Sequence, residues 1–191
     1  MDQSGTMKQL FPISLILILF IACQSSTSEP QDPEAGSSSK SVDTNWQLTT
    51  SEGINIHHPG DWEVDVSGFM GSKFLLYWPQ VEGDAFRENI NLTSQSLPEK
   101  ISDLAEVGEA TAGQLSTFVT NAKLQSQGLH ADGGHYELQY SGSQGNSDLT
   151  WYQRLYLAED QLYALTYTAD RKDFDTKLDA AKKCMDTFRL P

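Results

Sequence analysis

Two of the four histidines in this 191-residue chain have a spacing that could bind a metal ion. His130 and His135 flank the turn-forming segment 131–134, which could bring both imidazoles together with the carboxylate of Asp132. Imidazole and carboxylate groups are zinc ligands, but a zinc site needs a third or fourth ligand that this spacing does not identify. We therefore expect ordinary histidines in a loop and on a strand surface, with no bound metal ion and no other cofactor.

The other candidates for ion binding have simpler structural explanations. His57 and His58 are neighbours in an expected strand, so their side chains point to opposite faces and do not easily ligate one metal ion. Four aspartates near the last expected helix could attract calcium, although helix capping and a solvated helix face explain them more simply. These are Asp170, Asp173, Asp175 and Asp179.

The sequence lacks the short motifs that carry common enzyme chemistry. It contains no Gly-x-Ser-x-Gly elbow, phosphate-binding loop, His-Glu-x-x-His, Cys-x-x-Cys or calcium loop. We therefore predict no catalytic residue and no enzymatic activity.

Arg87 and Glu88 are candidate contact residues. They follow the loop segment 81–86 and precede an expected strand. Arg87 could pair with Glu88 or Asp84 and fix the loop, or it could face a partner. Fixing the loop is the simpler interpretation, and the partner surface remains the alternative.

Cys23 follows a short apolar segment, residues 10–22, that ends in the small residue Ala22. This segment is too short for a membrane-spanning helix, which needs about 20 apolar residues. An ordinary secretory signal would carry Ala-x-Ala before its cleavage site, and this chain has Phe20 at the first of those positions. The segment resembles the signal peptide of a bacterial lipoprotein, although Phe20 departs from the usual leucine.

The lipoprotein resemblance implies a domain organisation and a location. Residues 1–22 would be the signal peptide, and Cys23 would become the acylated N-terminus that anchors the protein to a membrane of the bacterial cell envelope. Residues 23–44 are rich in Ser, Pro and Glu and are expected to be a disordered tether. By resemblance to enterobacterial sorting, Gln24 favours the outer membrane. Residues 45–191 would form one domain.

The net charge of −13 limits the classes of partner. Such a surface repels nucleic-acid phosphates and anionic lipid headgroups, and no basic cluster offsets it. We expect no nucleic-acid binding, and membrane contact through the lipid alone.

Hydrophobic periodicity predicts an α+β domain. Alternating or continuous apolar segments predict strands at 46–50, 54–57, 62–66, 73–78, 89–93, 123–127, 134–140, 149–157 and 161–168, with helices at 101–119 and 174–188. Gly108 lies on the apolar stripe of the first helix, where it would allow close approach to the sheet. Cys184 lies on the apolar stripe of the second and is expected to be buried.

Three segments, in this order, resemble the PsbP-like superfamily: Ile54–Trp62 with its Pro-Gly turn, Phe86–Leu92, and Tyr163–Ala169 followed by Thr187–Leu190. The resemblance implies an antiparallel sheet with helices on both faces, an α/β/α sandwich. It also implies an accessory or binding protein rather than an enzyme. Given the lipoprotein-like signal, the DcrB-like branch is the nearest in context. The expected function is that of a lipid-anchored accessory protein held near a membrane complex with an envelope protein partner. The alternative is an envelope lipoprotein that binds a small molecule or a metal ion.

Overall fold

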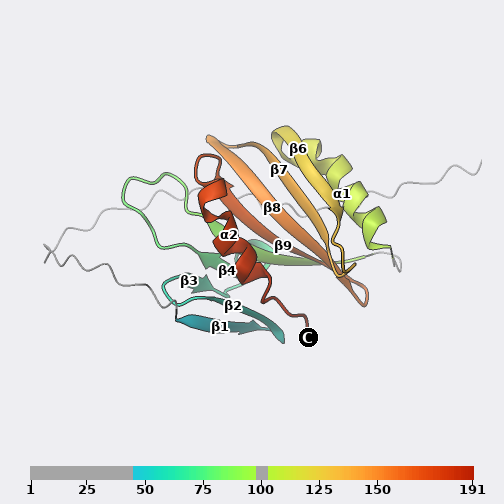
Figure 1. The fold of residues 1–191 in the computed structure, drawn as a ribbon, viewed down its shortest axis with the longest axis horizontal. Coiled ribbons are helices and arrows are strands. Elements are labelled where there is room, and N and C mark those ends of the chain that lie inside the picture. Colours follow the sequence, from blue (N-terminus) through green and yellow to red (C-terminus); the bar gives the residue numbers. More distant parts are fainter. Residues whose placement is uncertain (1–44, 98–102) are drawn as a thin grey trace, which may run out of the picture.

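The computed structural model describes residues 45–97 and 103–191. The predicted signal peptide, Cys23 and the predicted tether therefore lie outside the described residues. The elements follow in the order β1 (Trp46–Ser51), β2 (Ile54–Pro59), β3 (Glu63–Asp65), the 3-10 turn η1 (Phe69–Gly71), β4 (Ser72–Tyr77), β5 (Asn89–Ser96), α1 (Leu104–Phe118), β6 (Thr120–Leu129), β7 (Tyr136–Gln144), β8 (Ser147–Ala158), β9 (Gln161–Asp170) and α2 (Phe174–Met185). Figure 1 shows this arrangement.

The strands form two antiparallel sheets. β1 and β2 pair as a hairpin, and the other seven strands form one sheet in the order β3-β4-β5-β9-β8-β7-β6. Strand β9 pairs with β8 along its whole length, and the two strands lie near the middle of the large sheet. The predicted α+β architecture, a mostly antiparallel sheet with two helices, is confirmed.

Side chains that alternate along the strands build two separate hydrophobic clusters. In β9, Leu165 and Tyr167 belong to the cluster that contains Phe174 and Cys184 of α2. Leu162 of the same strand belongs to the cluster that contains residues of α1. Successive strand residues point to opposite faces, so Leu162 lies on the face of β9 opposite to Leu165 and Tyr167.

Helix α1 begins at Leu104 instead of the predicted residue 101, and a side chain caps its first turn. The Asp103 carboxylate accepts hydrogen bonds from the backbone amides of Ala105 and Glu106, which satisfies two of the free amides of the first turn. Gly108 is buried against the ring of Tyr136 in β7. The predicted close approach at Gly108 is therefore confirmed.

Some predicted boundaries are wrong. The segment 141–147 was expected to be a turn, but β7 runs to Gln144 and β8 begins at Ser147. The expected strand 62–66 shrinks to the three residues of β3, an edge strand whose Val64 is exposed. α2 ends at Met185, three residues before the predicted end.

Candidate functional site

The hairpin between β6 and β7 positions His130 and His135 opposite each other. The His130 amide donates to the carbonyl of His135 (2.9 Å), and the Gly133 amide donates to the carbonyl of His130 (2.8 Å). Gly133 has a φ of 74°, a left-handed conformation that glycine adopts without a steric penalty. The two imidazole rings stack with their centroids 4.3 Å apart and an interplanar angle of 18°. The sequence prediction that this turn brings the two histidines together is confirmed.

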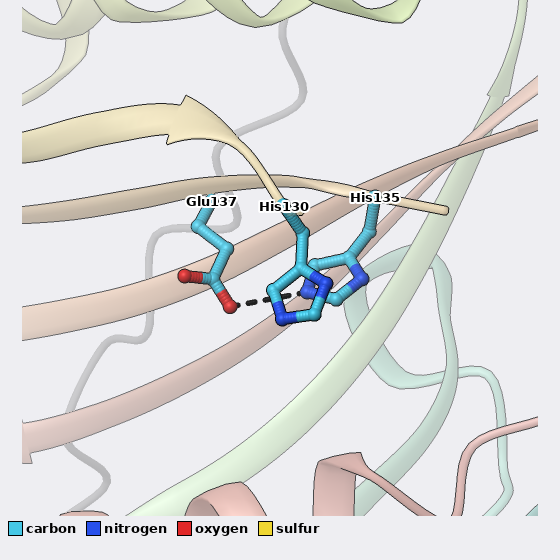
Figure 2. A group of neighbouring side chains, drawn as sticks. All are labelled: His130, His135 and Glu137. Carbon is cyan, nitrogen blue, oxygen red and sulfur yellow. Dashed lines mark hydrogen bonds and ion pairs between the residues drawn. The ribbon is translucent and has the colours of Figure 1, made fainter. Parts of the chain in front are cut away.

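Each histidine has its own carboxylate partner. His130 Nδ1 lies 2.9 Å from Asp132 Oδ1, which also accepts a hydrogen bond from the Gly134 amide. His135 Nε2 lies 3.0 Å from Glu137 Oε1, as Figure 2 shows. His130, His135 and Glu137 bring ligand atoms within 4.8 Å of one another. Glu137 is therefore the third residue of the possible metal-binding group. Asp132 contacts His130 but does not belong to that group.

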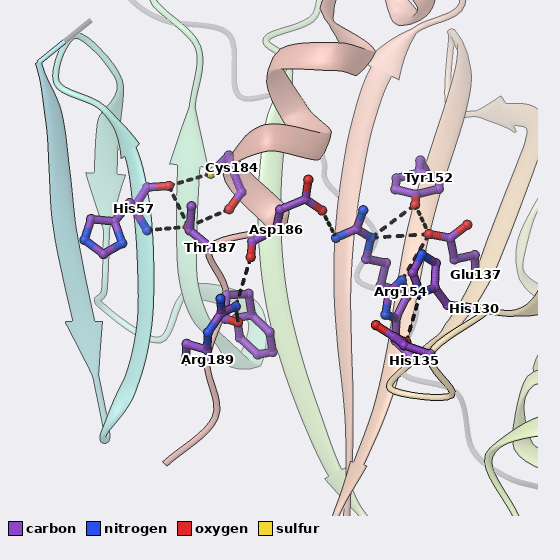
Figure 3. A network of polar contacts seen from close by, with 12 residues as sticks. His57, His130, His135, Glu137, Tyr152, Arg154, Cys184, Asp186, Thr187 and Arg189 are labelled. Atoms are coloured by element: carbon purple, nitrogen blue, oxygen red, sulfur yellow. Dashed lines mark hydrogen bonds and ion pairs between the residues drawn. The ribbon is translucent and has the colours of Figure 1, made fainter.

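A polar network extends from Glu137 across the sheet to the end of α2 (Figure 3). The Tyr152 hydroxyl donates to Glu137 Oε1, and Arg154 Nε donates to that hydroxyl (3.1 Å) while lying 3.6 Å from Glu137 Oε1. Arg154 also pairs with Asp186, with 2.7 Å between the guanidinium nitrogen and Oδ1. The buried Arg154 thus joins β7, β8 and the C-terminal segment.

The surroundings set the charge state of these groups. Burial lowers the pKa of His135 below its usual range, despite the opposing effect of the Glu137 hydrogen bond. Burial acts to raise the pKa of Glu137, but hydrogen bonds from Tyr152 and His135 outweigh it and the pKa is lowered. The hydrogen bond from His130 lowers the pKa of Asp132. The site therefore combines a neutral His135 with two ionised carboxylates.

The sequence alone did not group Glu137 with the two histidines as a ligand. His135 and Glu137 are separated by one position, and the period of a strand places such pairs on one face. The other contacts of Glu137 join different strands, and local spacing does not reveal them. His57 and His58 diverge as predicted, since His57 is exposed and His58 is buried against Thr49.

Arg87 and Glu88 lie in different environments. Arg87 Nε donates to the carbonyl of Trp78 (2.6 Å), and its guanidinium pairs with Glu63 (2.7 Å) instead of Glu88 or Asp84. Glu88 is only 2% exposed and pairs with Lys177 of α2. Both residues therefore hold the segment 78–88 to neighbouring elements.

A second acidic group forms beside this segment but differs from the histidine group. Asp84, Glu88 and Asp173 bring carboxylate oxygens within 4.8 Å of one another. Lys172 lies 3.4 Å from Asp84 and 3.6 Å from Asp173, and Lys177 pairs with Glu88. The ammonium groups of these two lysines therefore act as the counterions of the carboxylates.

The fold defined by this sheet order and these two helices is PsbP-like. Solved structures with a similar fold include cyanobacterial PsbP (CyanoP) from Synechocystis sp. PCC 6803, at 19% identity and a TM-score of 0.56, over 82% of this chain and 98% of that one. LpqN of Mycobacterium tuberculosis, described as involved in cell envelope biogenesis, is similar at 19% identity and a TM-score of 0.56, over 76% of this chain and 91% of that one. The Saccharomyces cerevisiae Ran-binding protein Mog1p is similar at 11% identity and a TM-score of 0.54, over 78% and 96%.

No family model matches this sequence. No curated protein matches it either. Because the structural neighbours share less than 25% identity with this chain, the similarity establishes the fold alone.

Proposed function

We propose that this chain is a lipid-anchored, non-enzymatic accessory or binding protein of the bacterial cell envelope. Its domain is an α/β/α sandwich with α1 and α2 on opposite faces of the large sheet, held near a membrane complex by acyl groups on Cys23. The fold supports this proposal, because one protein with a similar fold is described as involved in cell envelope biogenesis and another as Ran-binding. The sequence before Asn45 supports the anchor.

The proposed binding role rests on the position of the exposed apolar side chains. Large exposed apolar residues gather in the first part of the domain: Trp46, Leu48, Val64, Val66, Phe69 and Met70. They belong to β1, to β3 and to the segment that runs from Val66 through the turn η1, and Figure 1 shows β1 and β3 together in the lower part of the molecule. Exposed apolar groups that gather in this way mark contact surfaces for other proteins. The sequence places this part of the domain directly after the proposed tether.

The backbone of η1 holds its apolar side chains outward. Gly68, Met70 and Gly71 all have positive φ values, between 52° and 80°. Phe69 is 50% exposed in this turn. A positive φ is uncommon for a residue with a side chain, so Met70 occupies a conformation that the surrounding turn imposes. The turn therefore displays Phe69 and Met70 on a defined scaffold.

Membrane fractionation of a Cys23→Ala variant tests the anchor. We expect the wild-type chain in the membrane fraction after a high-salt wash and the variant in the soluble fraction. Cys184→Ala is the matched control, because it removes the other cysteine of the chain and should leave the protein on the membrane. A Cys23→Ala protein that stays membrane-bound contradicts the anchor.

Site-specific photo-crosslinking in native envelopes tests the contact surface. A photoreactive side chain at Phe69 should give a covalent adduct with an envelope protein. The same group at Leu124 is the control, since Leu124 is also exposed but lies on β6 at the other edge of the sheet. Equal adducts from both positions, or none from Phe69, would overturn the assignment of this surface.

A second candidate function, binding of a small molecule or a metal ion, has one observation in its favour. His130, His135 and Glu137 bring three potential ligand atoms close together, with His135 buried and His130 exposed. An accessory protein can also carry such a site, so the two functions are compatible.

A further inference from the structure

We propose that His130, His135 and Glu137 bind a divalent transition-metal ion of the Zn²⁺ class, with Asp132 orienting His130. This site adds to the accessory role proposed above and does not depend on it. Metal affinity is measured on purified protein, whereas anchoring is measured by fractionation, so the two proposals can fail separately.

The separation of the ligand atoms fits a shared metal ion. Bonds of about 2.0–2.2 Å in tetrahedral geometry place two ligand atoms about 3.3–3.6 Å apart. His135 Nε2 and Glu137 Oε1 are already 3.0 Å apart. When a metal ion binds between these two atoms, the single ring proton of neutral His135 would move from Nε2 to Nδ1, which leaves the lone pair of Nε2 for the ion. All three ligand atoms lie within 4.8 Å of one another, so a small movement of His130 would complete the set.

Asp132 prepares His130 for ligation. Its carboxylate lies 2.9 Å from His130 Nδ1, so it accepts the proton of that nitrogen and leaves the lone pair on Nε2. A carboxylate behind a ligating histidine fixes the tautomer and raises the basicity of the ligand nitrogen. His130 has 43% of its side chain exposed, and its ring can therefore turn out of the stack with His135.

The other two ligands are held in place by the fold. The side chain of His135 is 11% exposed and packs beside Tyr156, with 5.4 Å between ring centroids. Glu137 is fixed through Oε1 by Tyr152 and Arg154. The positive charge of Arg154 is balanced by its pair with Asp186.

The donor set selects the class of metal ion. Two imidazoles and one carboxylate suit Zn²⁺ and its neighbours in the first transition row, whereas Mg²⁺ and Ca²⁺ prefer sites made of oxygen ligands. Three protein ligands leave a fourth position for water or for a group from a partner. The separate Asp84–Glu88–Asp173 group already has two lysines as counterions, so it should not compete for the ion.

Isothermal titration calorimetry tests this site, with Zn²⁺ titrated into the full chain in detergent. We expect one ion per chain for the wild type and loss of that binding in His130→Ala and in His135→Ala. His57→Ala is the matched control, since His57 is an exposed histidine outside the group and should leave affinity unchanged. Asp132→Asn should weaken binding by about 10- to 100-fold, the usual effect of removing a partner of a ligating histidine.

Two further measurements keep the result interpretable. Thermal unfolding without metal should be the same for His130→Ala and the wild type, because His130 is half exposed, so a loss of binding there is not a loss of fold. The visible spectrum of bound Co²⁺ should appear in the wild type and be absent in His130→Ala. Equal Zn²⁺ affinity in wild type, His130→Ala and His135→Ala, or no binding by the wild type, would overturn the proposal.

Discussion

Gly108 of α1 lies directly against the aromatic ring of Tyr136 in β7. A Cβ atom on Gly108 would be 2.3 Å from two ring carbons, a distance that van der Waals contact does not allow. This single contact sets how closely α1 packs on the sheet, and Tyr136 itself is buried.

Gly108→Ala should therefore destabilise the protein by about 1–3 kcal/mol, the usual cost of overpacking a core, although alanine favours helices. Gly113→Ala is the control within the same helix, because no heavy atom lies within 4 Å of its added Cβ. That variant should be more stable than the wild type by up to about 1 kcal/mol. Chemical denaturation measures both, and an equal effect in both variants would contradict this account of the interface.

Lys177→Ala should cost about 3–5 kcal/mol of stability, because it leaves the buried carboxylate of Glu88 without its charged partner. Adding Glu88→Gln to the Lys177→Ala variant should recover much of the loss. Lys172→Ala is the control, since this lysine is largely exposed and should leave the midpoint of denaturation unchanged. Equal losses of stability in Lys177→Ala and Lys172→Ala would show that the burial of Glu88 does not raise the cost of removing its charged partner.

Arg87→Ala should loosen the segment 78–88, because it removes both the bond to the Trp78 carbonyl and the pair with Glu63. We expect a loss of about 1–3 kcal/mol and faster proteolysis within this segment, mapped by mass spectrometry. Glu63→Gln keeps the bond to Trp78 and should show little change. An unchanged cleavage pattern in Arg87→Ala would instead favour Arg87 as a contact with a partner.

Cys184 should react slowly with thiol reagents in native buffer and rapidly in denaturant. Its side chain is buried, and Sγ donates to the carbonyl of His57 (3.0 Å). Burial raises the pKa of the Cys184 thiol far above its usual value, which suppresses the reactive thiolate. Equal labelling in both buffers would contradict burial.

The raised pKa of Cys184 also makes stability depend on pH in a defined direction. The unfolded thiol ionises above about pH 8.5, while the folded thiol stays protonated. The free energy of unfolding should therefore fall as pH rises above that point, by about 1.4 kcal/mol per pH unit once the unfolded thiol is ionised. Cys184→Ala should lack this contribution, and parallel curves for both proteins between about pH 8.5 and 10 would be evidence against it.

The sequence allowed most of the fold to be predicted, because the signals are local. The stripe of α1 and the apolar β4 follow from the spacing of apolar residues, and Phe74, Leu75 and Leu76 are all fully buried. The extent of β7 was missed because Ser141–Gln144 has turn-forming residues, and pairing with β8 overrides their preference.

The candidate site was predicted in part for the same reason. The turn 131–134 showed that His130 and His135 could meet, and the Asp132 contact with His130 is equally local. The link from Glu137 through Tyr152 and Arg154 to Asp186 joins three distant segments. Such a link depends on strand order and register, which composition and spacing do not determine.

The hairpin of β1 and β2 determines how a force applied on the N-terminal side would be transmitted to the rest of the domain. Among the described strands, these two pair only with each other. β2 is joined to the C-terminal segment, where Asn55 and Arg189 exchange two backbone hydrogen bonds of 2.9 Å and Thr187 and Cys184 donate to the His57 carbonyl. A force applied at Trp46 would therefore load residues 184–189 before the seven-stranded sheet. The last residues of the chain would act as the mechanical clamp of a domain that is held from its first strand.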